Sequence, residues 1–236
     1  MTSSRRVGIL GGTFDPIHCG HLDAGSAAEQ ALGLDAMLVL PSNIPPHRPP
    51  PVASGYHRFA MVALAIAGRR KWQAMDLELR EGTRSFTSDT LRRLQRDGFG
   101  ASELFFIAGA DAFVDIATWK DYPAVLDLAN FAVISRPGIT AASVPDRLPA
   151  LAGRMRKPGG AADASTVIFL IDAPTADVSS TAIRGACARD ESIAEMVPPG
   201  VQQHIDRHAL YRHAKAPGDS GTRPAKEPAG RLHGQD

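Results

Sequence analysis

The stretch that decides the fold is Val7-Gly8-Ile9-Leu10-Gly11-Gly12-Thr13-Phe14-Asp15-Pro16-Ile17-His18-Cys19-Gly20-His21. Its first four residues form a short apolar run that two glycines end, which is typical of a buried parallel strand leaving its sheet. In open α/β sheets, ligands bind beyond the carboxyl ends of the strands. We therefore expect residues 11–21 to form a ligand-binding loop at one edge of a parallel sheet.

Predicted helices and strands alternate after this loop. Residues 20–32 are rich in Ala with Leu and Glu, which predicts a helix, and residues 36–40 predict a second strand. Further strands are expected at about 73–79, 103–108, 130–135 and 166–171, and helices at about 56–68, 88–97, 121–128, 180–189 and 198–209. This alternation predicts an α/β fold, a doubly wound parallel sheet with helices on both faces and right-handed crossovers.

Three segments depart from this alternation. Residues 41–51 hold six prolines and are expected to form an extended surface loop. Residues 137–164 are rich in Pro, Gly and Ala and include a basic cluster at 154–157, so we expect a mobile insertion there. Gly and Pro make up 7 of the 23 residues from 214 to 236, which predicts a disordered tail. The organisation expected is a single domain over residues 1–213.

Composition and charge exclude several classes of partner. The 236 residues carry 26 Lys and Arg against 25 Asp and Glu, a net charge of +1, so no bulk field attracts nucleic acid or an anionic membrane. Cys19 and Cys187 are too few for a disulfide framework, and no His/Cys cluster has zinc-finger spacing. The apolar run near the N-terminus is too short for a signal sequence. We expect a cytoplasmic protein, and the sequence leaves open whether it is a monomer or a homo-oligomer.

The loop itself carries groups suited to an anion. Gly11 and Gly12 let the backbone approach a phosphate, and His18 and His21 are three residues apart, so both can face one side as the helix begins. Neither a Walker A sequence nor Gly-x-Gly-x-x-Gly occurs in the chain. Taken singly, the histidines could be ordinary polar residues and the glycines a simple turn. Their position after the first strand favours a phosphate site.

A second anion site is predicted where the helix at 180–189 begins. Val178-Ser179-Ser180-Thr181-Ala182-Ile183-Arg184 places three hydroxyl residues at the helix start. A hydroxyl there is often only an N-cap, worth about 1 kcal/mol. However, a helix N-terminus offers free N–H donors and partial positive charge, and Arg184 adds a guanidinium suited to phosphate.

These two segments resemble signatures of one superfamily. His18-Cys19-Gly20-His21 matches the His-x-Gly-His motif of the nucleotidyltransferases, and residues 178–184 match Ile-Ser-Ser-Thr-x-Ile-Arg with Val in the first position. The resemblance implies a Rossmann-like nucleotidyltransferase fold in which both histidines bind the triphosphate of ATP and stabilise the charge that develops during transfer. It also implies that Ser180, Thr181 and Arg184 hold the β- and γ-phosphates.

Three more segments resemble the bacterial nicotinate-nucleotide adenylyltransferases. They are residues 41–48, residues 85–91, and residues 106–111 with Trp119 beyond them. The resemblance spans about residues 7–211 and implies residues that bind the acceptor: Asn43, His47, Arg48, Thr87, Trp119 and Lys120. It also implies residues that bind ATP: Gly11, Gly12, Thr13, Phe14, Asp111, Ser135 and Arg136.

The acceptor chemistry is consistent with this resemblance. Nicotinate mononucleotide offers a pyridine ring, a ring carboxylate and a 5′-phosphate. Trp119 could stack on the ring or belong to the core, and the N–H groups of the helix that begins near Thr87 could receive the carboxylate. Two departures weaken the match, because Lys120 follows Trp119 where the family often has Tyr, and Phe86 stands where Tyr is common. The backbone amide of Lys120 is still available to a carboxylate.

The activity that the resemblance implies is transfer of AMP from ATP to nicotinate mononucleotide, giving deamido-NAD and pyrophosphate. Mg2+ is the implied cofactor, bound mainly through the ATP phosphates. Asp15 is either an outer-sphere partner of this ion or a turn residue. The alternatives are transfer to nicotinamide mononucleotide or another phosphate-bearing acceptor, and a nucleotide-sensing module without catalysis.

Overall fold

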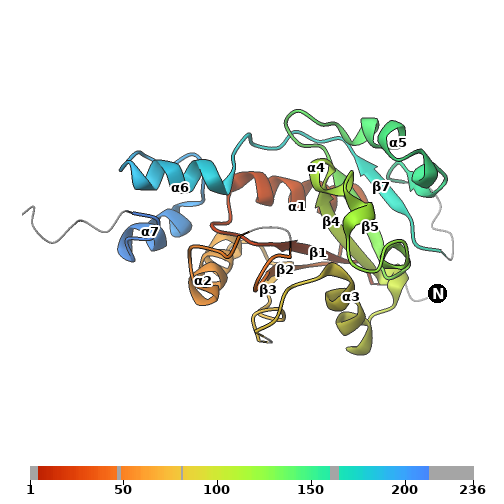
Figure 1. Ribbon diagram of the computed structural model, residues 1–236, viewed down its shortest axis with the longest axis horizontal. Coiled ribbons are helices and arrows are strands. Elements are labelled where there is room, and N and C mark those ends of the chain that lie inside the picture. Colours follow the sequence, from red (N-terminus) through yellow and green to blue (C-terminus); the bar gives the residue numbers. More distant parts are fainter. Residues whose placement is uncertain (1–4, 47–48, 81, 160–164, 213–236) are drawn as a thin grey trace, which may run out of the picture.

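The computed structural model describes residues 5–46, 49–80, 82–159 and 165–212. Within these ranges the strands form one seven-stranded parallel sheet in the order β3-β2-β1-β4-β5-β7-β6 (Figure 1). The strands are β1 (Val7–Gly12), β2 (Ala36–Pro41), β3 (Trp72–Ala74), β4 (Leu104–Gly109), β5 (Asn130–Ile134), β6 (Met155–Arg156) and β7 (Ile168–Ile171). The α-helices are α1 (Cys19–Leu32), α2 (Gly55–Ile66), α3 (Thr87–Arg96), α4 (Ala110–Phe113), α5 (Val144–Arg147), α6 (Ser180–Ala188) and α7 (Pro199–Arg207).

The strand order reverses beside β1. From β1 the chain moves outward through β2 to β3, then returns to pair β4 with the other side of β1 and continues outward through β5. The loops that leave β1 and β4 therefore turn to opposite faces of the sheet, and ligands of open α/β sheets bind where the strand order reverses in this way. The glycines at 11, 12 and 109 lie at this point, because they end β1 and β4.

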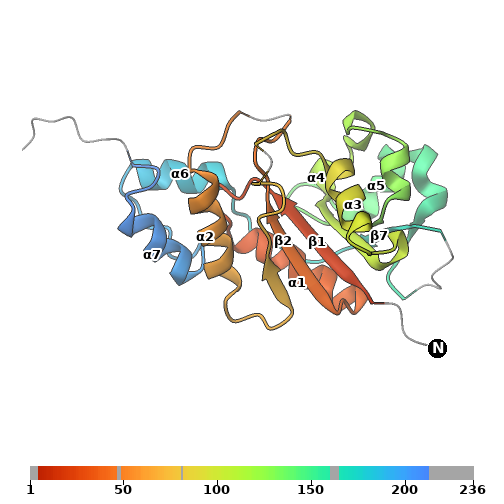
Figure 2. The same ribbon diagram turned by 90° about the horizontal axis from the view of Figure 1, so that it is seen from below.

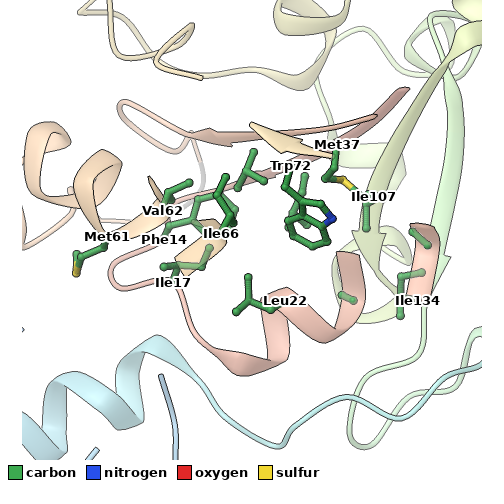
Figure 3. Close-up of a cluster of buried hydrophobic side chains, with 14 of the residues drawn as sticks. Phe14, Ile17, Leu22, Met37, Met61, Val62, Ile66, Trp72, Ile107 and Ile134 are labelled. Atoms are coloured by element: carbon green, nitrogen blue, oxygen red, sulfur yellow. The ribbon is translucent and has the colours of Figure 1, made fainter. Parts of the chain in front are cut away.

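Helices cover both faces, as the alternation of elements predicts. One buried cluster joins the sheet to α1, α2, α6 and α7, and the other joins it to α3, α4 and α5. Adjacent residues of β1 divide between them, since Ile9 belongs to one cluster and Leu10 to the other. Figure 3 shows part of the first cluster, where Leu22 of α1 and Ile66 of α2 approach the Trp72 ring at the edge of the sheet. The predicted doubly wound parallel sheet is confirmed.

Two predicted elements are wrong in extent. The strand expected at 73–79 has only three residues, Trp72–Ala74, and turns occupy residues 77–80. The helix expected at 121–128 is a short 3-10 helix at Ala124–Asp127. Proline at 123 disfavours helical backbone at the residue before it, and Asp121 has a φ of 63°, so an α-helix cannot begin at 121.

The segment expected to be an insertion contributes to the core over its described residues. Residues 141–154 form short helices, 155–156 form β6 at the sheet edge, and the side chains of Val144, Leu151 and Met155 are buried. Arg154 donates to the Asp127 carboxylate at 2.9 Å and to the carbonyl oxygen of Leu126 at 2.8 Å. Residues 160–164 and the tail from 214 lie outside the described residues, so the predicted mobility and disorder there stay predictions. In the ranges described, no helix combines the length and the apolar composition that a membrane crossing requires.

A buried arginine of α2 ties together the loops at the carboxyl end of the sheet. The Arg58 side chain is only 2% exposed. Its terminal nitrogens donate to the carbonyl oxygen of Thr13 after β1, at 2.7 Å, and to the carbonyl oxygens of Ser42 and Asn43 after β2. Its Nε donates to the carbonyl oxygen of Ala53 at 3.2 Å. One cation thus satisfies backbone acceptors from three separate segments.

Replacement of Arg58 by Ala tests this role. Truncation leaves several buried carbonyl oxygens without a donor, so we expect the free energy of unfolding to fall by about 3 kcal/mol or more. The matched control is Arg70→Ala, because Arg70 lies just beyond the same helix and is exposed, so a change within about 0.5 kcal/mol is expected. Urea denaturation measures both. Equal stability of the two variants would contradict the assignment.

Candidate active site

The loop after β1 has a backbone that its own residues and the neighbouring loops hold in place. Phe14 has a φ of 50° and a buried ring, and a Cβ added at Gly12 would lie 2.7 Å from that ring, so Gly12 must be glycine. The buried Asp15 carboxylate accepts from the backbone N–H groups of Val52 at 2.7 Å and Ala53 at 3.1 Å, and from the Tyr211 hydroxyl at 2.8 Å. Asp15 is thus an anchor of the loop.

The two predicted histidines lie side by side where α1 begins. His18 is the N-cap residue with extended backbone, and His21 occupies the third position of the helix. The backbone N–H of His18 donates to Nδ1 of His21 at 3.3 Å, and the two rings stack with centroids 3.7 Å apart. The three-residue spacing brings both imidazoles together, as the sequence predicts.

His18 is buried and electrostatically unusual. Its side chain is 2% exposed, and its Nδ1 has no hydrogen-bond partner among the described residues. Burial, and then the positive charge of Arg136, lower the pKa of His18 from 6.5 to about 4. The imidazole is therefore neutral at pH 7. A buried ring nitrogen without a partner is rare in a folded protein and is consistent with a site that a ligand completes.

The N-terminus of α6 docks against this loop. Ser179 caps the helix by accepting from the backbone N–H of Ala182 at 3.1 Å. Ser180 donates to the carbonyl oxygen of Pro16 at 2.9 Å, and Arg184 donates to that of Asp15 at 2.8 Å. The two segments predicted to bind phosphate are more than 160 residues apart in sequence and in contact in the structure.

Gly20 is where the start of α1 meets the loops of the other half of the sheet. A Cβ at Gly20 would lie 2.8 Å from the carbonyl oxygen of Ala176 and 3.1 Å from a guanidinium nitrogen of Arg136. Arg136 follows β5 and donates to the carbonyl oxygen of Gly20 at 3.4 Å. Only glycine fits this close approach, which explains why a glycine directly precedes the second histidine.

The residues predicted to bind the adenosine side surround the carboxyl ends of β4, β5 and β7. Asp111 is exposed and, with Arg136, crowds the position of Cβ at Gly109, so the two side chains converge there. The hydroxyl of Ser135 donates to the Asp172 carboxylate at 2.6 Å and accepts from the backbone N–H of Ala141 at 2.8 Å. Beside them lies a pocket of about 380 Å³ lined by residues 135–137 and 172–175.

The residues predicted to bind the acceptor gather around the segment that leads into α3. The backbone N–H of Asn43 donates to the Ser85 hydroxyl and its side-chain amide donates to the carbonyl oxygen of Thr83, both at 2.9 Å. Thr87 is the first residue of α3, directly after this segment. Trp119 is partly buried and packs edge-on against Phe106, so its ring belongs in part to the core. His47 and Arg48 lie outside the described residues.

The two departures from the family pattern contact each other. The Lys120 ammonium lies 4.9 Å from the centre of the Phe86 ring and donates to both carboxylate oxygens of Asp89, at 2.8 and 2.7 Å. Asp89 is in the first turn of α3. The lysine therefore links Trp119 to the N-terminus of α3, and the phenylalanine packs under its charge.

Sequence reasoning missed the residues that hold the site together. Arg58 and Tyr211 carry no motif, and their partners are a backbone carbonyl of the loop after β1 and the Asp15 carboxylate. The available signal was a single arginine directly before the apolar stretch 59–66 of the predicted helix, since a charge that joins an apolar stretch in the core needs buried partners. Tyr211 offered no comparable signal.

Comparison with known proteins first defines the class. The family model described as cytidylyltransferase-like matches residues 9–186, which contain the loop after β1 and most of α6. The chain belongs to this family of nucleotidyltransferases.

Individual relatives narrow the class further. The chain is 39% identical over 213 residues to a protein of Cronobacter sakazakii, covering 86% of this chain and 94% of that one, and 38% identical over 221 residues to a protein of Geobacter sp. strain M21, covering 89% and 100%. Both are named probable nicotinate-nucleotide adenylyltransferase. Within the cytidylyltransferase-like family, the chain belongs to the nicotinate-nucleotide adenylyltransferases.

Solved structures share the fold. The nicotinic acid mononucleotide adenylyltransferase of Plasmodium falciparum complexed with APC superposes with a TM-score of 0.67 at 19% identity, covering 88% of this chain and 97% of that one. A structure from Vibrio parahaemolyticus, named as that of a putative nicotinate-nucleotide adenylyltransferase, has a TM-score of 0.56 at 19% identity, covering 89% of this chain and 97% of that one. At this identity the likeness supports the Rossmann-like fold.

The lowered pKa of His18 predicts how stability depends on pH without nucleotide. The unfolded chain takes up a proton on this residue near pH 6.5, whereas the folded protein does so only near pH 4. The unfolded state binds more protons between these values, so the free energy of unfolding falls as the pH is lowered through this window, by about 3 kcal/mol at pH 4. The stability of the wild type relative to His18→Asn should fall by this amount between pH 7 and pH 4 in urea denaturation. An imidazole NMR titration of His18 with its midpoint near 6.5 would contradict the prediction.

Proposed function

We propose that this protein transfers AMP from ATP to nicotinate mononucleotide, giving deamido-NAD and pyrophosphate. The observation that carries the proposal is the contact between the loop after β1 and α6, through Ser180 and Arg184. This contact brings the neutral, buried imidazole of His18, the imidazole of His21 and the N-terminus of α6 together at the carboxyl end of the sheet. Imidazole and backbone N–H donors at such a place suit a triphosphate. The named relatives support nicotinate mononucleotide as the acceptor.

Catalysis then rests on placement and charge stabilisation by this chain. A 5′-phosphate oxygen of the acceptor attacks the α-phosphorus of ATP in line, a new P–O bond forms, and the bond from the α-phosphorus to the bridging oxygen breaks as pyrophosphate leaves with its electron pair. The acceptor phosphate is already a nucleophile, so no general base is needed. His18 and His21 donate to the oxygens on which negative charge develops, and Arg184 and the N–H groups of α6 hold the departing phosphates.

Mg2+ fits this site through the phosphates of ATP. This ion prefers oxygen ligands and keeps several waters, whereas the side chains described at the phosphate site are mostly N–H and O–H donors. The Asp15 carboxylate is occupied by two backbone N–H groups and the Tyr211 hydroxyl, so it supports the loop instead of the ion. When bound to the phosphates, Mg2+ neutralises part of their charge.

The remaining residues divide between the two nucleotides. We assign the adenosine of ATP to the pocket lined by residues 135–137 and 172–175, next to Asp111 and Arg136, because it adjoins the start of α1 through Gly20. We assign the nicotinate ring to the side of Trp119 and Thr87, where the N-terminus of α3 can receive its carboxylate. The cysteines at 19 and 187 are free, which fits our proposal of a cytoplasmic enzyme.

Pyrophosphate release from ATP tests the function. The purified protein with ATP and Mg2+ should release pyrophosphate only when nicotinate mononucleotide is added, with deamido-NAD formed in equal amount. The same assay with nicotinamide mononucleotide should give a lower kcat/KM, since the amide lacks the carboxylate. Equal kcat/KM for the two acceptors would contradict the acceptor assignment. Absence of turnover with every phosphate-bearing acceptor, despite ATP binding, would favour a sensing module instead.

Replacement of His18 by Ala tests the role of the buried imidazole. Loss of one preorganised donor to the developing charge should lower kcat by about 10²–10³-fold. His233→Ala, which removes a histidine near the end of the chain, is the control and should retain wild-type turnover. Since His18 is the buried N-cap residue of α1, circular dichroism should show that the variant is folded. Near-normal turnover in a folded His18→Ala protein would overturn the assignment.

Replacement of Lys120 by Ala distinguishes binding of the acceptor by the backbone N–H at this position from binding by the lysine side chain. If the acceptor carboxylate binds the backbone N–H at this position, the KM for nicotinate mononucleotide should change by less than about fivefold, because exposed ion pairs such as Lys120–Asp89 contribute up to about 1 kcal/mol. Steady-state kinetics with both acceptors measures this. A large rise in the KM for nicotinate mononucleotide, without a rise for nicotinamide mononucleotide, would show that the Lys120 ammonium binds the ring carboxylate.

A further inference from the structure

Three histidines converge where α7 packs against α2. His57 lies in the first turns of α2, and His204 and His208 lie four residues apart at the end of α7, so both can face the same neighbour. The two helices run side by side beyond one end of the sheet (Figures 1 and 2). No part of the proposed reaction uses these side chains.

The ring nitrogens lie close enough to share one ligand. Nδ1 of His57 and Nε2 of His204 are 3.1 Å apart, and one nitrogen from each of the three rings lies within 4.8 Å of the other two. Tetrahedral coordination at 2.0–2.1 Å places ligand nitrogens about 3.3 Å apart, so small side-chain rotations would complete the set. The ring centroids are 4.9 Å apart for His57 and His208 and 4.5 Å for His204 and His208.

Imidazole side chains alone make up the candidate ligand set. A metal ion binds neutral imidazole through the lone pair of a ring nitrogen. Nδ1 of His57 and Nε2 of His204 face each other at 3.1 Å, and a metal ion bound by both nitrogens would replace a hydrogen bond between them. The nearest acidic residue in α7, Asp206, pairs with Arg212 at 3.0 Å, which leaves three imidazoles as the ligand set.

We propose that His57, His204 and His208 form a binding site for a divalent transition-metal ion of the Zn2+ class. Imidazole ligands favour Zn2+, Co2+, Ni2+ and Cu2+ over Mg2+, which prefers oxygen. Three protein ligands leave a fourth position for water. The site is separate from the Mg2+ that accompanies ATP, and it does not depend on the proposed reaction.

The bound ion would hold the C-terminal helix in place. His57 precedes Arg58, whose guanidinium binds the carbonyl oxygens after β1 and β2, and α7 leads to Tyr211, which donates to Asp15 of the same loop. Both helices thus carry anchors of the active-site loop. A metal ion that clamps α7 to α2 would stabilise these anchors by favouring the folded state.

Calorimetric titration with Zn2+ tests the site. The full chain is used without an affinity tag of histidines, in excess Mg2+ and without nucleotide. We expect saturable binding of one Zn2+ per chain, loss of this binding in His208→Gln, and no change in a His213→Gln/His233→Gln protein, whose replaced histidines lie outside the described residues. The His208 side chain is exposed, so its replacement should leave the fold intact, which circular dichroism checks.

Two further measurements sharpen the test. Zn2+ should raise the Tm of the wild type but not that of His208→Gln, and His204→Gln should behave like His208→Gln. Co2+ should give the visible absorption of a four-coordinate ion in the wild type alone. If the wild type shows no saturable binding, or binds Zn2+ no more tightly than His208→Gln, the cluster is only a hydrogen-bonded group of histidines and the proposal is overturned.

Discussion

The buried guanidinium of Arg58 is the interaction on which the active-site end of the molecule depends. Parallel strands end in loops whose backbone carbonyls need donors, and burial excludes water from supplying them. Arg58 supplies donors to Thr13, Ser42, Asn43 and Ala53 at once. Asp15 lies nearby, and its negative charge partly offsets the burial that lowers the pKa of Arg58. This pair of opposite charges fixes the loop after β1 relative to α2 and, through Tyr211, to the chain beyond α7.

A loop held in this way can present its histidines without help from a ligand. Catalysis by charge stabilisation requires donors that are in place before the reaction, because reorganisation during the reaction reduces their effect. His18 meets this requirement through burial, its stacking on His21 and the close fit of Gly20. In the same loop, the carbonyl oxygen of Asp15 accepts from Arg184 and that of Pro16 accepts from Ser180. The loop after β1 therefore positions α6. Active-site geometry and fold stability therefore share residues.

The sequence predicted the parallel sheet and pointed to the two segments that meet at the start of α1, because these features depend on local pattern. Each signal occupies about ten residues or fewer and can be recognised without knowledge of distant contacts. The signals are the apolar run before two glycines, the His-x-Gly-His motif, and the hydroxyl cluster before Arg184. Contacts between residues distant in sequence, such as Arg58 with Thr13 or Tyr211 with Asp15, could not be predicted, because no local pattern indicates them. The contact between Lys120 and Phe86 could not be predicted either, although each residue was noted as a departure from the family pattern. The helix predicted at 121–128 is wrong because Pro123 disfavours helical backbone at the residue before it, so only a short 3-10 helix forms at Ala124–Asp127.

The claim that residues 11–21 and 179–184 form a single triphosphate site is tested most directly by a crystal structure with a non-hydrolysable ATP analogue. We expect the phosphates to lie between the imidazoles of His18 and His21 and the N-terminus of α6, with adenine beside the pocket lined by residues 135–137 and 172–175. Phosphates bound away from the start of α1, or held by only one of the two segments, would contradict it.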